Sequence, residues 1–441
     1  MSYIDIVPYT SVFIDANWSD FIKSAWWCTT SSISDEPKII KSIEELLINE
    51  VNPNFVLPCL SVRSGLDLFL QAFKFPPGSE IIMSAMNIPA MVEIVHEHGL
   101  EVVALDIDAT TMKPKLELLE SLITSKTKAV ILANIYGRGY DLEPYIEIAK
   151  RYNLLVVQDW AEGFTGLNNF GNPNADLSLF SFGPIKYCTA FGGAIAKIRD
   201  ENVYYRMKNL LDAYPRQTHG DYLHRIIKYS IVYMLLNCPK IVKPGLYISK
   251  KLRMDIKEKV IGLLRGFPNQ MMLRIRQKPC LALLKTLLMK LKTFNFEDFN
   301  QSFVKASYAV NHMPANVQLV GMKAEEMNFW LFPIIVDNPD ETIKILNELG
   351  VDGYKGATQL NFVTSDRPST GLLPHYTNLS LPIQNIDTSV NDLCRGFVRS
   401  SGICSKDSEY YDSKTTDCKQ GFNSICNINN NNNINNNNIN N

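Results

Sequence analysis

Between about residues 55 and 200, short apolar runs alternate with segments that place apolar residues on one helical face. The segment 64–74 is an example, because Leu66, Phe69, Leu70 and Phe73 recur at helical spacing. The predicted elements are helix 64–74, strand 80–83, helix 90–99, strand 101–105, helix 115–123, strand 129–132, helix 143–152, strand 154–157 and a further strand-like run 194–196. Strands that alternate with helices of this length predict an α/β fold with a mostly parallel sheet.

The pattern changes after residue 200. Helical periodicity dominates first, and a second α/β pattern then follows, with a strand over 330–336 and a helix over 340–349. The predicted helices of the intermediate region are 203–213, 222–236, 254–264 and 281–291. We therefore expect an N-terminal segment (1–50) that packs on a small domain, with Trp26 and Trp27 in that contact, a large domain (51–200), a helical insertion (201–280), a smaller α/β C-terminal domain (281–395) and a polar tail (396–441). The last fifteen residues of that tail are 12 Asn and 3 Ile, which cannot form a core, so we expect disorder.

Charge and cysteine content narrow the class of protein. The chain has 44 basic and 45 acidic residues, a net charge of −1, which gives no electrostatic case for a nucleic-acid partner. Its nine cysteines include no C-x-x-C pair, which favours reduced thiols in a cytoplasmic protein. The N-terminus lacks the pattern of a signal peptide, and no apolar run reaches the length of a membrane span.

Two further features bear on membrane contact and metal binding, and the first leaves alternatives open. The apolar run 229–239 is flanked by basic residues, so it is either a core or subunit-interface helix or a site of weak membrane contact through 222–247. His96 and His98 lie two positions apart on a predicted helix and therefore point to different sides, so no metal site is expected.

The candidate chemistry lies at predicted strand ends. Asp159 follows the strand 154–157, and Lys186 follows the next apolar run, which ends at Phe182 before a Gly-Pro turn. In a parallel sheet, ligands gather at the carboxyl ends of the strands. A lysine that can bind an aldehyde, beside a carboxylate that can keep a pyridine nitrogen protonated, is the pair that pyridoxal phosphate (PLP) requires.

A set of motifs in one order extends this interpretation. The motifs are Ser61-Val62-Arg63-Ser64-Gly65-Leu66-Asp67, Pro77-Gly78-Ser79-Glu80-Ile81-Ile82, Val103-Ala104-Leu105-Asp106-Ile107-Asp108, Thr127-Lys128-Ala129-Val130, Tyr136-Gly137, Gln158-Asp159-Trp160-Ala161-Glu162-Gly163, and Phe180-Ser181-Phe182 with Lys186 and Gly192-Gly193. This order resembles the DegT/DnrJ/EryC1/StrS family of PLP-dependent sugar aminotransferases, which have fold type I. The resemblance covers about residues 50–200 and, more weakly, 280–385.

The resemblance implies a role for each matched residue. Lys186 would form the Schiff base with PLP and later move a proton, and Asp159 would pair with the pyridinium nitrogen. Glu162 matches the residue that touches the ring oxygen, where the family often has Gln or His. Ser181, Ser64 and Gly65 match the groups that bind the phosphate, and Met86 takes the ring-stacking position, which is usually aromatic.

Structural explanations exist for single residues. Ser64 before a helix is most simply an N-cap, and Gly65 a turn residue. The family usually has Thr where this chain has Leu66, and its phosphate-binding Asn from a second subunit has only Asn269 as a match. His375 falls near a loop that borders the substrate in the family, although a surface histidine explains it equally well.

The resemblance implies transamination by a homodimer. Glutamate would be the amino donor, and a keto-sugar nucleotide would be the keto acceptor. Two alternatives stay open: another PLP chemistry such as dehydratase or lyase activity, against which Lys186 speaks because dehydratase relatives have His there, and a catalytically silent binding or membrane-associated protein on the same fold.

Overall fold

The computed structural model describes residues 13–48, 54–167, 169–237, 270–312, 317–336, 338–348 and 360–366. All of these belong to one compact unit, residues 1–401. The strands are β1 (Phe55–Cys59), β2 (Glu80–Ser84), β3 (Met86–Asn87), β4 (Glu101–Leu105), β5 (Thr127–Ala133), β6 (Arg138–Gly139), β7 (Leu155–Asp159), β8 (Leu177–Ser181), β9 (Ala194–Ile198), β10 (Gln318–Leu319), β11 (Glu326–Met327), β12 (Ile334–Ile335) and β13 (Asn361–Phe362). The helices are α1 (Trp18–Thr30), η2 (Ile33–Asp35), α2 (Glu36–Leu47), α3 (Val62–Phe73), α4 (Pro89–Glu97), α5 (Leu116–Leu122), α6 (Glu143–Arg151), α7 (Glu201–Ala213), α8 (His219–Asn237), α11 (Met271–Ile275), α12 (Leu281–Lys292), α13 (Phe296–Asn311) and α14 (Pro339–Glu348).

A seven-stranded sheet forms the centre of the fold, in the order β1-β9-β8-β7-β5-β2-β4. Neighbouring strands from β8 to β4 are parallel, whereas β9 runs antiparallel to both β8 and β1. The expected mostly parallel α/β sheet is confirmed. Its parallel strands bring the ends of β5, β7 and β8 to one edge.

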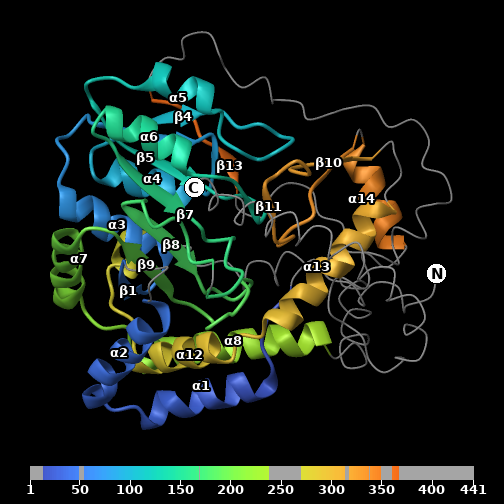
Figure 1. Ribbon diagram of the computed structural model, residues 1–441. Helices are drawn as coiled ribbons and strands as arrows, with labels where there is room; N and C mark the ends of the chain where they lie inside the picture. The colour runs from blue at the N-terminus through green and yellow to red at the C-terminus, as the bar shows by residue number, and fades with distance from the viewer. Residues whose placement is uncertain are drawn as a thin grey trace, which may run out of the picture. The chain divides into compact units, whose positions relative to one another are not determined.

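Alternate residues of the strands pack into separate cores on the two faces of the sheet. On one face, Ile81 and Met83 join the core of α3, α4 and α7. On the other, Ile82 joins the core of α5 and α6. Figure 1 shows these helices in layers around the sheet. Because every face of the sheet is covered, its strands are nearly continuous apolar runs, as a buried parallel sheet requires.

The N-terminal helices pack with later helices at the β1–β9–β8 end of the sheet. Helix α1 contacts α8 and α12, and α2 contacts α12 and β1. The prediction that Trp26 is a core residue is wrong, because the residue is 64 % exposed, whereas Trp27 is partly buried against this core. Trp26 shares the outward face of α1 with Trp18 and Ile22 at four-residue spacing, and the opposite face carries the buried contacts.

The elements agree closely with the sequence pattern, with a few shifts. Helix α3 begins two residues earlier than predicted, because Ser61 is its N-cap and accepts a hydrogen bond from the amide of Ser64. In the second α/β pattern, α14 matches the predicted helix, but only Ile334–Ile335 of the predicted strand 330–336 is paired, with β10. The predicted helix 254–264, the four cysteines after residue 390 and the Asn-rich tail lie outside the described residues. The domain boundaries stay a prediction.

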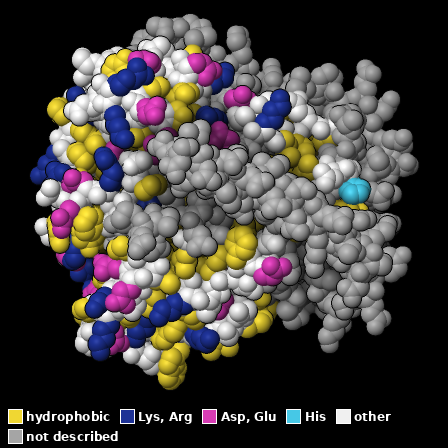
Figure 2. Space-filling model, in the orientation of Figure 1, with side chains coloured by type: hydrophobic (Ala, Val, Ile, Leu, Met, Phe, Trp, Pro, Cys, Tyr) yellow, Lys and Arg dark blue, Asp and Glu magenta, His cyan; other side chains and the backbone are white. Residues whose placement is uncertain are grey.

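Surface charge and hydropathy agree with the composition. Basic and acidic side chains are interspersed over the described part of the face in Figure 2. Among the described helices, none is both long enough and apolar enough to span a bilayer. Helix α8, the described part of the segment considered for membrane contact, buries Tyr222, Ile226, Tyr229 and Val232 and exposes Ile227 and Ile231.

Candidate active site

The candidate site lies where β7 and β8 end. Asp159 is the last residue of β7 and Ser181 is the last residue of β8, and the two strands are parallel neighbours. Lys186 lies in the loop that connects β8 to the antiparallel strand β9, and its amide donates to the carbonyl of Gly183. The sheet therefore brings the predicted lysine and carboxylate to the same edge.

The Lys186 amine is enclosed by an acid and an aromatic ring. Its Nζ lies 3.4 Å from Oε1 of Glu162 and 3.7 Å from the ring centroid of Trp330. Burial lowers the pKa of Lys186, and the charges of Glu162 and Asp159 oppose that shift. A lysine whose pKa is lowered by burial has a larger neutral fraction, and the neutral amine is the form that attacks a carbonyl.

Asp159 is shifted in the opposite direction. The residue is 7 % exposed, and burial raises its pKa from 3.8 to about 6. The hydrogen bond that Oδ1 accepts from the amide of Ala161 acts in the opposite direction and lowers the pKa. The charge of Glu162 adds to the increase, whereas those of Lys186 and Arg63 reduce it. This carboxyl group can therefore exchange a proton near neutral pH.

Glu162 connects the lysine to the turn after β5. Its Oε1 faces Lys186, and its Oε2 accepts a hydrogen bond from the amide of Tyr136 at 2.8 Å. Tyr136 and Gly137 both have positive φ, 58° and 68°. A Cβ on Gly137 would lie 1.6 Å from Oδ1 of Asn328, so both the backbone and the close contact require glycine there.

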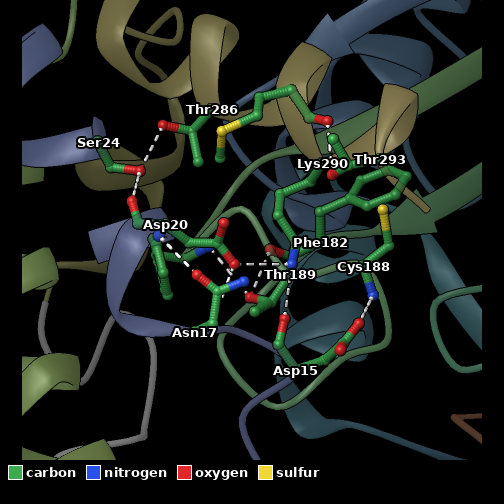
Figure 3. Close-up of polar contacts among 12 residues, drawn as sticks. Asp15, Asn17, Asp20, Ser24, Phe182, Cys188, Thr189, Thr286, Lys290 and Thr293 are labelled. Atoms are coloured by element: carbon green, nitrogen blue, oxygen red, sulfur yellow. Dashed lines mark hydrogen bonds and ion pairs between the residues drawn. The ribbon is translucent and has the colours of Figure 1, made fainter. Parts of the chain in front are cut away.

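The N-terminal segment fixes the loop that follows the lysine (Figure 3). The amide of Cys188, a residue with φ of 57°, donates to Oδ2 of Asp15 at 2.6 Å. Lys290 of α12 ties Asp15 and α1 together, because its Nζ donates to the Asp15 carbonyl and forms an ion pair with Asp20. Thr189 closes the loop internally through its hydrogen bond to the Gly183 carbonyl.

Ser64 and Gly65 serve packing in this structure. Ser64 is not the N-cap, since that position belongs to Ser61, and its buried hydroxyl donates to the carbonyl of Ile275. Gly65 is not a turn residue but lies inside α3, where a Cβ would be 2.6 Å from Leu179 of β8. Glycine therefore lets the helix approach the sheet closely. The phosphate-binding roles implied for these two residues stay predictions.

The remaining predicted positions are distributed as follows. Ser181 is half-buried, and its Oγ accepts a hydrogen bond from the amide of Gly183 at 3.4 Å. Met86 pairs with Phe362 of β13 and packs beside a small core that contains Tyr136. Its ring-stacking role stays a prediction. Asn269 and His375 lie outside the described residues.

The two histidines considered as metal ligands contact different carboxylates. His96 Nε2 lies 2.8 Å from Asp366, and His98 Nε2 lies 3.0 Å from Asp67. Within the described ranges, no group of His, Cys, Asp and Glu side chains is arranged to hold a metal ion.

Three site residues were missed by sequence reasoning. Arg63, in the first turn of α3, interacts electrostatically with Asp159 and Lys186. Its place inside the Ser61–Asp67 motif was a signal that could have found it. Asn328 and Trp330 come from a distant segment with no recognisable motif, and only the fold brings them to the lysine.

Comparison with known proteins agrees with this geometry. The family model described as the DegT/DnrJ/EryC1/StrS aminotransferase family matches residues 17–237. GDP-perosamine synthase of Caulobacter vibrioides is 28 % identical over 212 residues, which are 48 % of this chain and 57 % of that protein. UDP-2-acetamido-2-deoxy-3-oxo-D-glucuronate aminotransferase of Pseudomonas aeruginosa is 32 % identical over 167 residues, 37 % of this chain and 46 % of that protein. The chain thus spans about half the length of these curated relatives.

Solved structures support the fold. GDP-4-keto-6-deoxy-D-mannose-3-dehydratase of Escherichia coli aligns with a TM-score of 0.55 at 14 % identity over 78 % of this chain and 84 % of that one. The aminotransferase TlmJ of Streptoalloteichus hindustanus aligns with a TM-score of 0.54 at 13 % identity over 77 % of this chain and 82 % of that one. The predicted fold type I architecture is therefore confirmed. Because the family model matches half of the sequence, the chain belongs to the DegT/DnrJ/EryC1/StrS aminotransferase family.

Proposed function

We propose that this protein is a PLP-dependent aminotransferase that uses Lys186 as its covalent anchor and proton carrier. The observation that carries the proposal is the arrangement of two groups at neighbouring parallel strands: a partly buried lysine, with a lowered pKa, in the loop after β8, and a buried aspartate, with a raised pKa, at the end of β7. Membership of the family and the names of the relatives support it.

The residues present fit the cofactor. The amine of Lys186 suits its aldehyde, and the carboxyl group of Asp159 suits its pyridine nitrogen. The positive charge of Arg63 and the hydroxyl of Ser181 suit an anionic phosphate. Asn134, whose amide donates to the Asp159 carbonyl, also keeps a buried side-chain oxygen without a hydrogen-bond partner in the described part of the chain. When bound, PLP supplies an electron sink for electrons released at the substrate carbon.

The protein's own groups would perform the remaining tasks. Asp159 would hold a proton at the pyridine nitrogen, and Glu162 would orient the Lys186 amine through the 3.4 Å contact. Once released from the cofactor, a neutral Lys186 would accept a proton from the donor's carbon and deliver it to the cofactor's carbon. It would carry a proton in the reverse direction when the acceptor takes the amino group. Lys186 is also the residue that separates this chain from the His-containing dehydratase relatives, which share the fold.

We infer glutamate as donor and a keto-sugar nucleotide as acceptor. The relatives named as perosamine synthase and UDP-sugar aminotransferases support the acceptor class. We also propose a homodimer in the cytoplasm. The free cysteines Cys28, Cys59, Cys188 and Cys280 of the described chain are consistent with a reducing compartment.

Covalent trapping tests the proposal. The full-length protein is incubated with PLP, reduced with borohydride and digested, and the modified peptide is identified by mass spectrometry. We expect the label on Lys186 and none in Lys186→Ala. Lys197 is an internal control, because burial also lowers its pKa, to about 8, while its Nζ is held by the carbonyls of Phe170 and Gly171. Equal labelling of Lys197 would contradict the assignment.

Donor specificity is tested separately. Adding glutamate to the loaded protein should release 2-oxoglutarate and shift the cofactor's visible absorbance, and a keto-sugar nucleotide should then restore it. Trapping on Lys186 without any response to amino acids would leave the cofactor in place but overturn transamination. Absence of trapping would favour the catalytically silent alternative.

A further inference from the structure

A short segment from the C-terminal half of the chain, residues 328–330, reaches the reactive lysine. The indole of Trp330 lies over Lys186, with Nζ 3.7 Å from the ring centroid. The same side chain donates from Nε1 to the carbonyl of Ile185 at 2.9 Å. Trp330 therefore contacts the lysine at its amine and holds the backbone immediately before it.

Asn328 fixes this segment to the rest of the site. Its side chain is buried, with 3 % of the residue exposed, and makes two hydrogen bonds: Nδ2 donates to the Glu162 carbonyl at 2.7 Å, and Oδ1 accepts from the Trp330 amide at 2.9 Å. Its own amide donates to the carbonyl of Gly137 at 2.9 Å. One residue thus joins the indole, the turn that carries Glu162 and the loop after β5.

The arrangement limits where the amine can be. Glu162 lies on one side of Nζ, and the face of Trp330 covers it at 3.7 Å. The face of an aromatic ring attracts a cation, so the indole stabilises the ammonium form and holds it beside the carboxylate. The other charged groups that act on this amine are Asp159 and Arg63, and burial opposes the charged form.

We propose that Trp330 is a positioning residue of the active site, which holds the Lys186 amine beside Glu162, and that Asn328 sets the place of the indole. The inference rests on the proposed function, in which Lys186 is the reactive amine. By this inference, residues 328–330 influence both the charge and the position of that amine.

The test compares two substitutions that separate the ring from its hydrogen bond. Trp330→Leu keeps an apolar cover but removes the aromatic face, whereas Trp330→Phe keeps a face and removes the Nε1 donor. The rate of PLP capture on Lys186 is measured against pH by borohydride quenching of the full-length protein. Below the midpoint of the wild-type profile, we expect Trp330→Leu to react about 2- to 5-fold faster, because a cation–π contact of about 0.5–1 kcal/mol is lost. Trp330→Phe should keep the wild-type midpoint.

Phe329→Leu is the matched control, because the Phe329 ring faces the guanidinium of Arg138, not Lys186. It should leave the capture profile unchanged, and thermal melting of each variant checks folding. A wild-type profile in Trp330→Leu would overturn the proposal. So would an equal shift in Trp330→Phe, since the hydrogen bond would then account for the effect without the ring.

A second reagent separates this inference from the proposed function. Trinitrobenzenesulfonate labels neutral amines without any cofactor site, and mass spectrometry quantifies its label on Lys186. If PLP is not captured by the wild-type protein but the Trp330→Leu profile with this reagent shifts as expected, the aminotransferase proposal fails and the positioning role stands. If neither reagent shows the shift, the positioning role is overturned.

Discussion

Burial moves the two ionisable groups of the site toward their neutral forms. It lowers the pKa of Lys186 and raises that of Asp159 to about 6. Glu162 opposes the shift of Lys186 but adds to that of Asp159, whereas Arg63 opposes the shift of Asp159 but adds to that of Lys186. A buried acid and a partly buried base whose charge states respond to each other are typical of a functional site and are rarely needed for folding alone.

Asp159→Asn should increase the free energy of unfolding relative to the wild type, by an amount that grows with pH. With a pKa of 3.8 in the unfolded chain and about 6 in the folded one, the folded protein binds the extra proton between these values. The stability that this proton contributes to the wild-type protein is therefore fully present below about pH 4. It is lost as the pH rises through about 6, and the loss amounts to about 3 kcal/mol in the free energy of unfolding. Asparagine has no such proton to lose.

Urea denaturation of the cofactor-free protein between pH 4 and pH 8 measures this difference. The unfolding free energy of Asp159→Asn minus that of the wild type should increase across this range and level off above pH 7. A difference that stays constant with pH would show that burial does not perturb this carboxyl group.

At the scale of elements, α3 is placed by close contact with the sheet. Gly65 faces Leu179 of β8 and Ala196 of β9 at 2.6 and 3.7 Å from an ideal Cβ. The approach brings the first turn of the helix, with Ser61 and Arg63, to the edge where Asp159 and Lys186 lie. A glycine that resembles a phosphate-loop residue in sequence thus acts here through helix packing.

Gly65→Ala should destabilise the protein by about 1–2 kcal/mol. Overpacking against the fully buried Leu179 costs about 1–3 kcal/mol, and the better helix propensity of alanine returns less than 1 kcal/mol. Gly220→Ala in the first turn of α8 is the matched control, because its Cβ would meet only Thr218 Oγ1 at 3.6 Å. Chemical denaturation should separate the two, and equal effects would contradict the packing argument.

At the scale of the whole molecule, Asp67 joins elements that are far apart in the chain. Its buried carboxylate accepts hydrogen bonds from Arg276 and Tyr214 and contacts His98 and Gln71. These partners come from α3 itself, the ends of α4 and α7, and the segment after α11. Burial alone would raise the pKa of Asp67, but the bonds from His98 and Arg276 outweigh it and lower the pKa below 3.8.

Asp67→Ala should cost about 3–5 kcal/mol at pH 7, because the buried partners lose their shared acceptor. A carboxyl group with a lowered pKa stabilises the protein above about pH 4, and this contribution is lost as the pH falls below that value. The deficit of the variant should therefore shrink below pH 4 in urea titrations. Glu45→Ala, which breaks an exposed pair with Lys41, should cost less than about 1 kcal/mol. A similar loss in both variants would contradict the conclusion that Asp67 stabilises the fold by joining these separate elements.

Much of the fold could be predicted because its signals are local. The helices and strands between 80 and 213 match the hydrophobic periods. The expected Asp159 ends β7, and Lys186 lies in the loop after β8. The errors have local causes too. Ser61 caps α3 in preference to Ser64. In α1, aromatic residues lie on both the buried and the exposed face of the helix, so spacing alone could not show that Trp26 is exposed.

The sequence by itself determined the α/β architecture, the parallel sheet and the lysine–aspartate pair, because periodicity, strand ends and motif order are encoded along the chain. Only the tertiary structure decided what surrounds that pair. Trp330, Asn328 and Asp15 lie more than a hundred residues from Lys186 along the chain. Their contacts depend on how separate elements meet, and no short-range pattern specifies that. The charge state of Lys186 depends on the same burial and neighbours, so it too is a property of the folded chain.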